Sequence, residues 1–179
     1  MRVMSLTGVF SVLFALMLLA PKTHAKGSLI ELENLQTLSE KSQQSSLPIM
    51  LIFGAEWCEY CQVLNEFVFD PMMLSKMYEG KVVIMRHVGV DEEASIPDWQ
   101  GNLINKSNWA YQINADLTPT VLFFDANGKE VAPRIIGISE LNLVTSLIHQ
   151  NLNIAYKNMG LSKRIPFTAE QLEMQQQNQ

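Results

Sequence analysis

The sequence predicts an α/β fold in which a central mixed β-sheet is flanked by helices on both faces. Residues 48–54 form a short, continuous apolar run bounded by proline and glycine, which is typical of a strand buried on both faces. Residues 81–90 and 118–125 predict two further strands. Segments with helical spacing of apolar residues separate and follow these strands, so the order is a βαβ unit followed by a hairpin.

Residues 1–25 are typical of an export signal. Arg2 gives a positive start, an apolar run follows, and Ala25 stands where a signal peptidase would cut. We therefore expect an exported protein. An uncleaved anchor is the alternative, although the run is at the lower limit of the roughly 17–25 residues that span a bilayer. The expected organisation is a signal peptide at 1–25, one domain at 26–160 and a polar, mobile C-terminal tail at 161–179.

The charge of the exported part excludes one class of partner. Removal of Arg2 and Lys22 leaves 11 of the 13 basic residues against 18 acidic ones, a net charge of −7. Nucleic-acid binding needs a basic stripe or patch, so we expect no nucleic-acid partner. Two cysteines are also too few for the disulfide framework of a small secreted scaffold.

The individual elements follow in order from local patterns. Leucines at near-helical spacing predict a helix over 29–46 that ends before Pro48. A helix follows the cysteines, and Asp70-Pro71 is expected to interrupt or kink it. The acidic stretch 91–106 has no period and is expected to be a surface loop.

The C-terminal half continues the alternation. Residues 107–113 predict a short helix, and Asn127-Gly128 predicts the turn of a hairpin. Pro133 places the returning strand, 129–138, at an edge or a bulge. A long helix over 139–159, capped by Ser139, ends the domain.

The segment GAEWCEYCQVL holds the only two cysteines, Cys58 and Cys61, where a buried strand passes into a helix. The start of a helix favours the thiolate of Cys58, which is the reactive form. Cys61, one turn later, shares a face with Leu64 and Phe67, so it should be shielded. We expect Cys58 to attack a substrate disulfide and Cys61 to resolve the mixed disulfide.

The cysteine pair has two alternative roles, a structural disulfide and a metal site. A purely structural disulfide at this spacing would stabilise the fold little, because closing so short a loop hardly constrains the unfolded chain. A thiolate pair could carry a soft ion such as Cu(I), with His87 and His149 as the remaining candidate ligands. Each histidine is better explained by ordinary packing, and we expect no metal site.

Three segments together resemble the thioredoxin family: WCEYC after a buried strand, TPT at a later strand start, and FFDANGK through a hairpin. The resemblance covers about residues 30–158. It is greatest to exported bacterial members, namely periplasmic thioredoxins of the sulfur-oxidation type and the C-terminal domain of the inner-membrane disulfide reductase.

The resemblance implies a thioredoxin-like fold and a thiol:disulfide oxidoreductase whose only cofactor is its own dithiol. It implies a cis peptide bond between Thr118 and Pro119. These two residues and Trp57 would bind the substrate chain. One departure is Ile52, which stands where cytoplasmic thioredoxins carry a buried acid thought to relay protons. Another is the Glu59-Tyr60 pair between the cysteines, which is neither Gly-Pro nor Pro-His.

Two carboxylates flank the first cysteine and indicate the direction of electron flow. Glu56 and Glu59 would oppose the Cys58 thiolate, and a less stable thiolate makes the dithiol more reducing. We therefore expect a reductase of other exported proteins, supplied with electrons by a membrane partner. A periplasmic oxidase or isomerase is the alternative.

Overall fold

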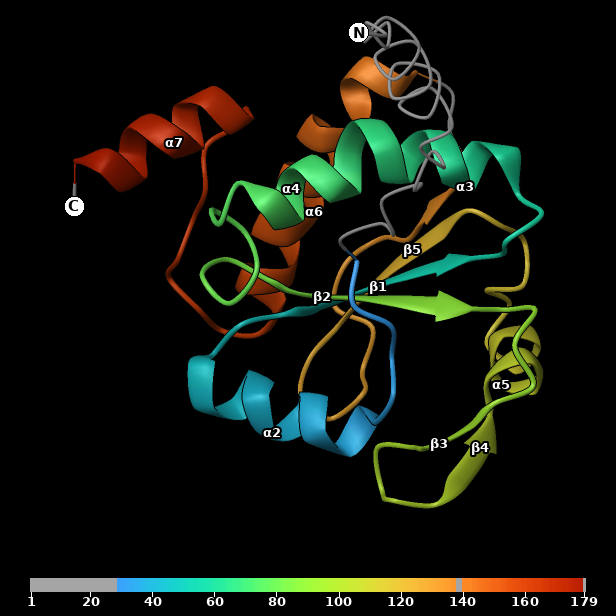
Figure 1. Cartoon of the computed structure of the whole chain (residues 1–179). Helices are drawn as coiled ribbons and strands as arrows, with labels where there is room; N and C mark the ends of the chain where they lie inside the picture. Colours follow the sequence, from blue (N-terminus) through green and yellow to red (C-terminus); the bar gives the residue numbers. More distant parts are fainter. Residues whose placement is uncertain (1–28, 138–139, 179) are drawn as a thin grey trace, which may run out of the picture.

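A computed structural model describes residues 29–137 and 140–178. Its main sheet has four strands in the order β2-β1-β5-β6, and Figure 1 shows helices on either side of it. The strands are β1 (Ile49–Gly54), β2 (Ile84–Gly89), β5 (Thr120–Phe124) and β6 (Ile135–Ile136). β1 is parallel to β2 and antiparallel to β5, which is antiparallel to β6. The predicted mixed α/β sheet is confirmed.

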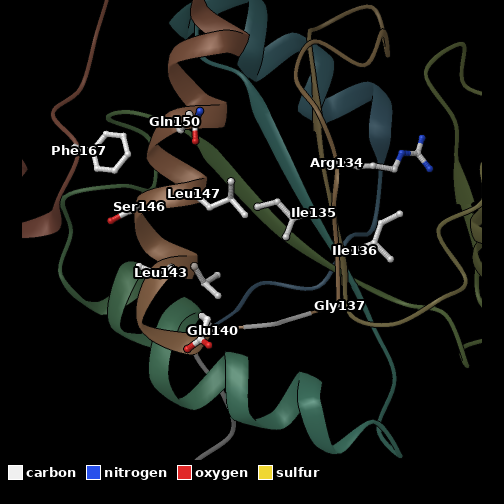
Figure 2. A pocket seen from close by; sticks show the side chains of 11 residues that line it. Arg134, Ile135, Ile136, Gly137, Glu140, Leu143, Ser146, Leu147, Gln150 and Phe167 are labelled. Atoms are coloured by element: carbon white, nitrogen blue, oxygen red, sulfur yellow. The ribbon is translucent and has the colours of Figure 1, made fainter.

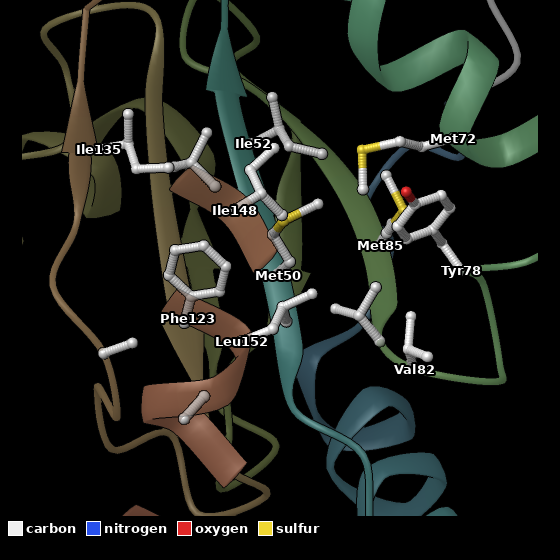
Figure 3. Packing of buried hydrophobic residues seen from close by; sticks show 14 of the residues in the cluster. Met50, Ile52, Met72, Tyr78, Val82, Met85, Phe123, Ile135, Ile148 and Leu152 are labelled. Carbon is white, nitrogen blue, oxygen red and sulfur yellow. The ribbon is translucent and has the colours of Figure 1, made fainter. Parts of the chain in front are cut away.

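The two faces of the sheet carry separate apolar cores, because successive side chains of a strand point to opposite faces. Leu51 and Phe53 of β1 pack with residues of α2 (Leu35–Ser45) and α5 (Lys106–Gln112). Met50 and Ile52 pack on the other face with Met72 of α4 (Asp70–Leu74) and with α6 (Leu141–Asn158), as Figure 3 shows.

The helix after the cysteines is continuous but changes its winding. It consists of α3 (Glu59–Leu64), a π-helical segment (Asn65–Phe69) and α4. Pro71 occupies the first turn of α4, where the missing N–H of proline is tolerated. The predicted irregularity therefore lies one turn before the proline, as a π segment.

The first predicted helix begins later than its leucine spacing suggested. Residues 29–34 are extended along the edge of β2, with hydrogen bonds from Leu32 N to His87 O (2.8 Å) and from His87 N to Ile30 O (2.9 Å). α2 begins at Leu35, and the side chain of Asn34 accepts a hydrogen bond from Thr37 N as its N-cap. The segment thus covers an edge that would otherwise have unpaired backbone groups.

The stretch predicted as an irregular loop, 91–106, contains a small hairpin. β3 (Ser95–Pro97) pairs antiparallel with β4 (Leu103–Asn105). Trp99, between these strands, packs against Phe124 at a centroid distance of 5.6 Å. The strands have only three residues each, too few for a period to be visible in the sequence.

The end of the domain also differs in detail from the prediction. The returning strand is reduced to an isolated bridge at Glu130 and the two residues of β6. Pro133 lies between them at the sheet edge, as its missing N–H predicts. The expected cap, Ser139, lies outside the described residues, and Glu140 occupies the N-cap position of α6 without a side-chain hydrogen bond.

The C-terminal segment 161–178, expected to be a polar tail without regular structure, contains a helix in the described structure. It contains α7 (Ala169–Gln177), and Leu172 is 1% exposed within the core on the α6 face. The helix was not predicted because the segment is polar overall and α7 itself buries only Leu172.

The predicted export signal at 1–25 lies outside the described residues. Among the residues described, no helix is long and apolar enough to cross a membrane.

Candidate active site

Both cysteines lie at the end of β1 where the chain turns into α3. Cys58 and Cys61 form a disulfide, and Cys58 is the N-cap residue of α3. The Cys61 backbone N–H donates to Cys58 Sγ at 3.1 Å, and Cys58 N donates to Ala55 O at 3.1 Å. The turn therefore brings a backbone donor to the sulfur expected to become the thiolate.

The two cysteine residues are buried to the same degree in this oxidised state. Cys58 and Cys61 are each 5% exposed, so burial alone does not distinguish an attacking from a resolving residue. Their neighbours Trp57 and Tyr60 are each 69% exposed. An apolar surface therefore borders the disulfide, and Trp57 lies on it rather than in the core.

The loop that presents the cysteines is held by hydrogen bonds to its backbone. Glu56 N donates to Asp91 Oδ2 at 2.9 Å, and the Gln62 side-chain amide donates to Glu56 O at 2.9 Å. The side chains of Glu56 and Glu59 are exposed on either side of Cys58 in the sequence. They are thus placed to act on the sulfur only through solvent.

Thr118 and Pro119 lie at the same end of the sheet as the cysteines. Thr120 pairs with Phe53, so the residues just before β5 lie beside the end of β1. The Thr118–Pro119 peptide bond is cis, which confirms the expected isomer. Thr118 Oγ1 is buried and has no hydrogen-bond partner within the described residues. Contact of this segment with a substrate stays a prediction.

A charged cluster beside the disulfide was missed by sequence reasoning. His87 Nδ1 contacts Glu31 Oε2 at 2.5 Å, and Lys106 Nζ lies 2.6 Å from Glu31 Oε1 and 2.7 Å from Glu92 Oε2. Lys106 is 2% exposed. These residues are far apart in the sequence; the bridge between Glu31 and β2 places Glu31 beside His87, and Lys106 reaches both carboxylates from α5.

The pKa shifts within this cluster follow from its ion pairs. Burial alone would raise the pKa of Glu31, but hydrogen bonds from His87 and Lys106 outweigh it and lower the pKa of this carboxyl. Burial would lower the pKa of Lys106, but its contacts with Glu31 and Glu92 raise it. Glu31 is therefore a carboxylate and Lys106 an ammonium at neutral pH.

Other features offer less for this chemistry. No group of three or more potential metal ligands occurs among the described residues. A groove of about 710 Å³ lies between β6 and α6 and is lined by Ile136, Leu143, Leu147 and Phe167 (Figure 2). It has neither a cysteine nor a histidine in its lining, so the redox chemistry has to be sought at the end of β1.

Comparison with known proteins agrees with this geometry. A family model described as a thioredoxin-like domain matches residues 35–150. The thiol:disulfide interchange protein DsbD of Campylobacter jejuni is 32% identical over 100 residues, which cover 55% of this chain and 15% of that protein. The chain therefore spans only a small part of this relative. The thioredoxin of Rickettsia bellii is 27% identical over 117 residues, covering 65% of this chain and 93% of that protein.

A solved thioredoxin-fold protein from Helicobacter pylori has the same fold, with a TM-score of 0.50 and 16% sequence identity over 74% of this chain and 81% of its own. The family model itself covers well over half of the chain. The chain therefore belongs to the thioredoxin-like family, and its Cys-x-x-Cys pair is at disulfide distance.

Proposed function

We propose that the protein is exported to the periplasm and reduces disulfides of other exported proteins, with Cys58 as the nucleophile and Cys61 as the resolving residue. The observation that carries the proposal is the Cys58–Cys61 disulfide at the N-cap of α3, with a backbone N–H 3.1 Å from Cys58 Sγ. A hydrogen bond to this sulfur favours its thiolate.

The reaction proceeds by two exchanges. The Cys58 thiolate attacks one sulfur of the substrate disulfide, and the other substrate sulfur leaves as a thiolate. Cys61 then attacks Cys58 Sγ, which releases the second substrate sulfur and forms the Cys58–Cys61 disulfide. The substrate gains two electrons and two protons, and a membrane electron donor restores the dithiol.

The surface around the disulfide suits an unfolded or extended protein segment. Trp57, in the active-site loop, is 69% exposed, and Tyr60 and Phe67, on the helical run that follows, are 69% and 59% exposed. Exposed aromatic side chains supply contact area for a chain without requiring a defined sequence. No binding pocket for a small substrate is needed for this function.

Trapping of mixed disulfides tests the assigned roles. Cys61→Ser should accumulate mixed disulfides with exported proteins, because Cys58 still attacks and release is blocked. Cys58→Ser is the matched control and should trap far fewer. The adducts are counted on non-reducing gels of periplasmic extracts, and identified by mass spectrometry. Equal trapping by the two variants would contradict the assignment.

A further inference from the structure

We propose that His87 is the proton acceptor for Cys61 in the second exchange, and that Glu31 is the positioning residue that holds its imidazole. This inference rests on the proposed function, in which Cys61 has to lose a proton before it can resolve the mixed disulfide. The residues assigned here are outside the cysteine motif and come from β2 and the extended segment beside it.

The register of the sheet places His87 on the face that α3 covers. His87 pairs with Ile52 in parallel strands, so both side chains leave the sheet on the same face, as does Gly54 two residues later. A β-carbon added to Gly54 would lie 2.8 Å from His87 Nε2 and 3.6 Å from Cys61 Sγ. The nitrogen and the sulfur therefore lie at most about 6.4 Å apart, the sum of these two distances.

One bridging water spans about 6 Å, because each of its two hydrogen bonds contributes about 3 Å, so it can join the two atoms at separations just below this upper limit. The imidazole side chain is 22% exposed, so water has access to it. Gly54 makes the approach possible, because any side chain at this position would occupy the space over which Nε2 and Sγ face each other.

The partner of the other ring nitrogen sets the tautomer. Nδ1 contacts the Glu31 carboxylate, which has no proton to give, so Nδ1 carries the proton and donates it. In the tautomer that carries its proton on Nδ1, Nε2 is an acceptor, and it lies next to Gly54 on the side of Cys61. Glu31 is fixed in turn by Lys106 Nζ at 2.6 Å and by Gly89 N at 3.1 Å.

The proton transfer completes the balance of the second exchange. The Cys61 thiol gives its proton through water to His87 Nε2, and the new thiolate attacks Cys58 Sγ. The Cys58–substrate bond breaks, its electron pair leaves on the substrate sulfur, and the imidazolium or solvent returns a proton to that sulfur. The charged groups that face His87 are the Glu31 carboxylate and, behind it, Lys106 paired with Glu92.

The location of His87 also compensates for Ile52 on β1, which stands where a buried acid would otherwise accept the proton. Ile52 is 2% exposed and has no titratable group, but its register partner on β2 is His87. A base is thus supplied from the neighbouring strand, to the same face of the sheet.

Stopped-flow reaction of the fully reduced protein with 5,5′-dithiobis(2-nitrobenzoate) separates the two exchanges. Release of the first thiolate reports attack by Cys58, and its rate depends on protein concentration. Release of the second reports attack by Cys61, and its rate is independent of protein concentration. For His87→Gln at pH 7 we expect the second phase to slow at least about tenfold, below the roughly 10²–10⁴-fold range of direct acid–base catalysis. The first phase should change less than about twofold.

The pH profile distinguishes proton transfer from a merely structural role. The second phase of His87→Gln should rise towards the wild-type rate as pH increases above 8, because Cys61 then ionises without a base. Glu31→Gln should slow the same phase. Glu92→Gln, which removes a carboxylate from Lys106 without touching His87, is the matched control and should not.

Each outcome decides a separate question. A wild-type protein with no two-phase reaction would contradict the proposed function itself. Two phases in the wild type with an unchanged second phase in His87→Gln would overturn the role of His87, as would an equal loss of both phases at every pH. If His87→Gln does not fold, the Glu31→Gln and Glu92→Gln pair decides, and equal second-phase rates would overturn the proposal.

Discussion

At the scale of single residues, Gly54 connects the fold to the chemistry. It ends β1 just before the cysteine loop, and its missing side chain leaves room for the His87 ring. Real β-carbon contacts do not approach 2.8 Å, so a methyl group here has to displace the imidazole or α3. Because the contact with Glu31 holds the imidazole ring in place, displacing the ring lowers the stability of the folded protein.

Gly54→Ala should therefore lower the free energy of unfolding by about 1–3 kcal/mol, the usual cost of overpacking. Gly89→Ala is the matched control: its β-carbon would also lie 2.8 Å from a neighbour, but that neighbour is the half-exposed Glu92 side chain. Its effect should stay within about 1 kcal/mol. Urea unfolding of the reduced proteins measures both, and equal stabilities would show that the ring at Gly54 moves freely.

At the scale of elements, His149 of α6 fastens the C-terminal segment to the domain. Its Nδ1 lies 2.7 Å from the Pro166 carbonyl oxygen and its Nε2 lies 2.9 Å from the Tyr78 hydroxyl. A carbonyl only accepts, so Nδ1 donates and the neutral Nε2 accepts from Tyr78. Burial lowers the pKa of His149, and opposing contacts with Pro166 and Glu170 do not restore it.

This shift makes stability depend on pH in a defined window. In the unfolded chain His149 binds a proton below about pH 6.5, whereas in the folded chain it does so only at lower pH. The contribution of neutral His149 to the free energy of unfolding is therefore fully present above about pH 6.5 and is lost as the pH falls below it. The loss cannot exceed about 1.4 kcal/mol per pH unit. Urea unfolding at pH 7.5 and 5.5 should show a smaller pH effect in His149→Gln than in the wild type. An identical pH effect in both would contradict the shifted pKa.

Some elements could be predicted from sequence patterns and others could not. β1, β2 and β5 were predictable because buried strands need continuous apolar residues. The hairpin of β3 and β4, at three residues a strand, carries no period, and α7 buries a single leucine. Residues 29–34 have leucine spacing that suits a helix, but pairing with β2 overrides it, since tertiary contacts outweigh local propensity.

At the scale of the whole molecule, the cysteine pair and the Thr118–Pro119 segment were predictable because each occupies a short contiguous motif. The Glu31–His87–Lys106 cluster was not, because its members come from the N-terminal segment, β2 and α5. Only the strand order and the Gly54–Gly89 register place them at the end of the sheet that carries the disulfide. A site assembled from the pairing of distant strands leaves no local signal.

The direction of electron flow is also a property of the whole site. The Cys61 backbone N–H that donates to Cys58 Sγ would stabilise a thiolate there, whereas the exposed carboxylates Glu56 and Glu59 would oppose it, each by about 1 kcal/mol or less. At about 30 mV for 1.4 kcal/mol, Glu59→Gln should raise the reduction potential by roughly 10–20 mV, and Glu59→His by more. Glu66→Gln, an exposed carboxylate farther along the helical run, is the control and should leave it unchanged.

The reduction potential of the Cys58–Cys61 couple, titrated against dithiothreitol or glutathione, tests the reductase function most directly. A value nearer the thioredoxin potential of about −270 mV than the strong-oxidant value of about −120 mV is expected, with the Glu59 variants shifted upwards. A wild-type value above about −170 mV would contradict the reductase and indicate an oxidase in its place.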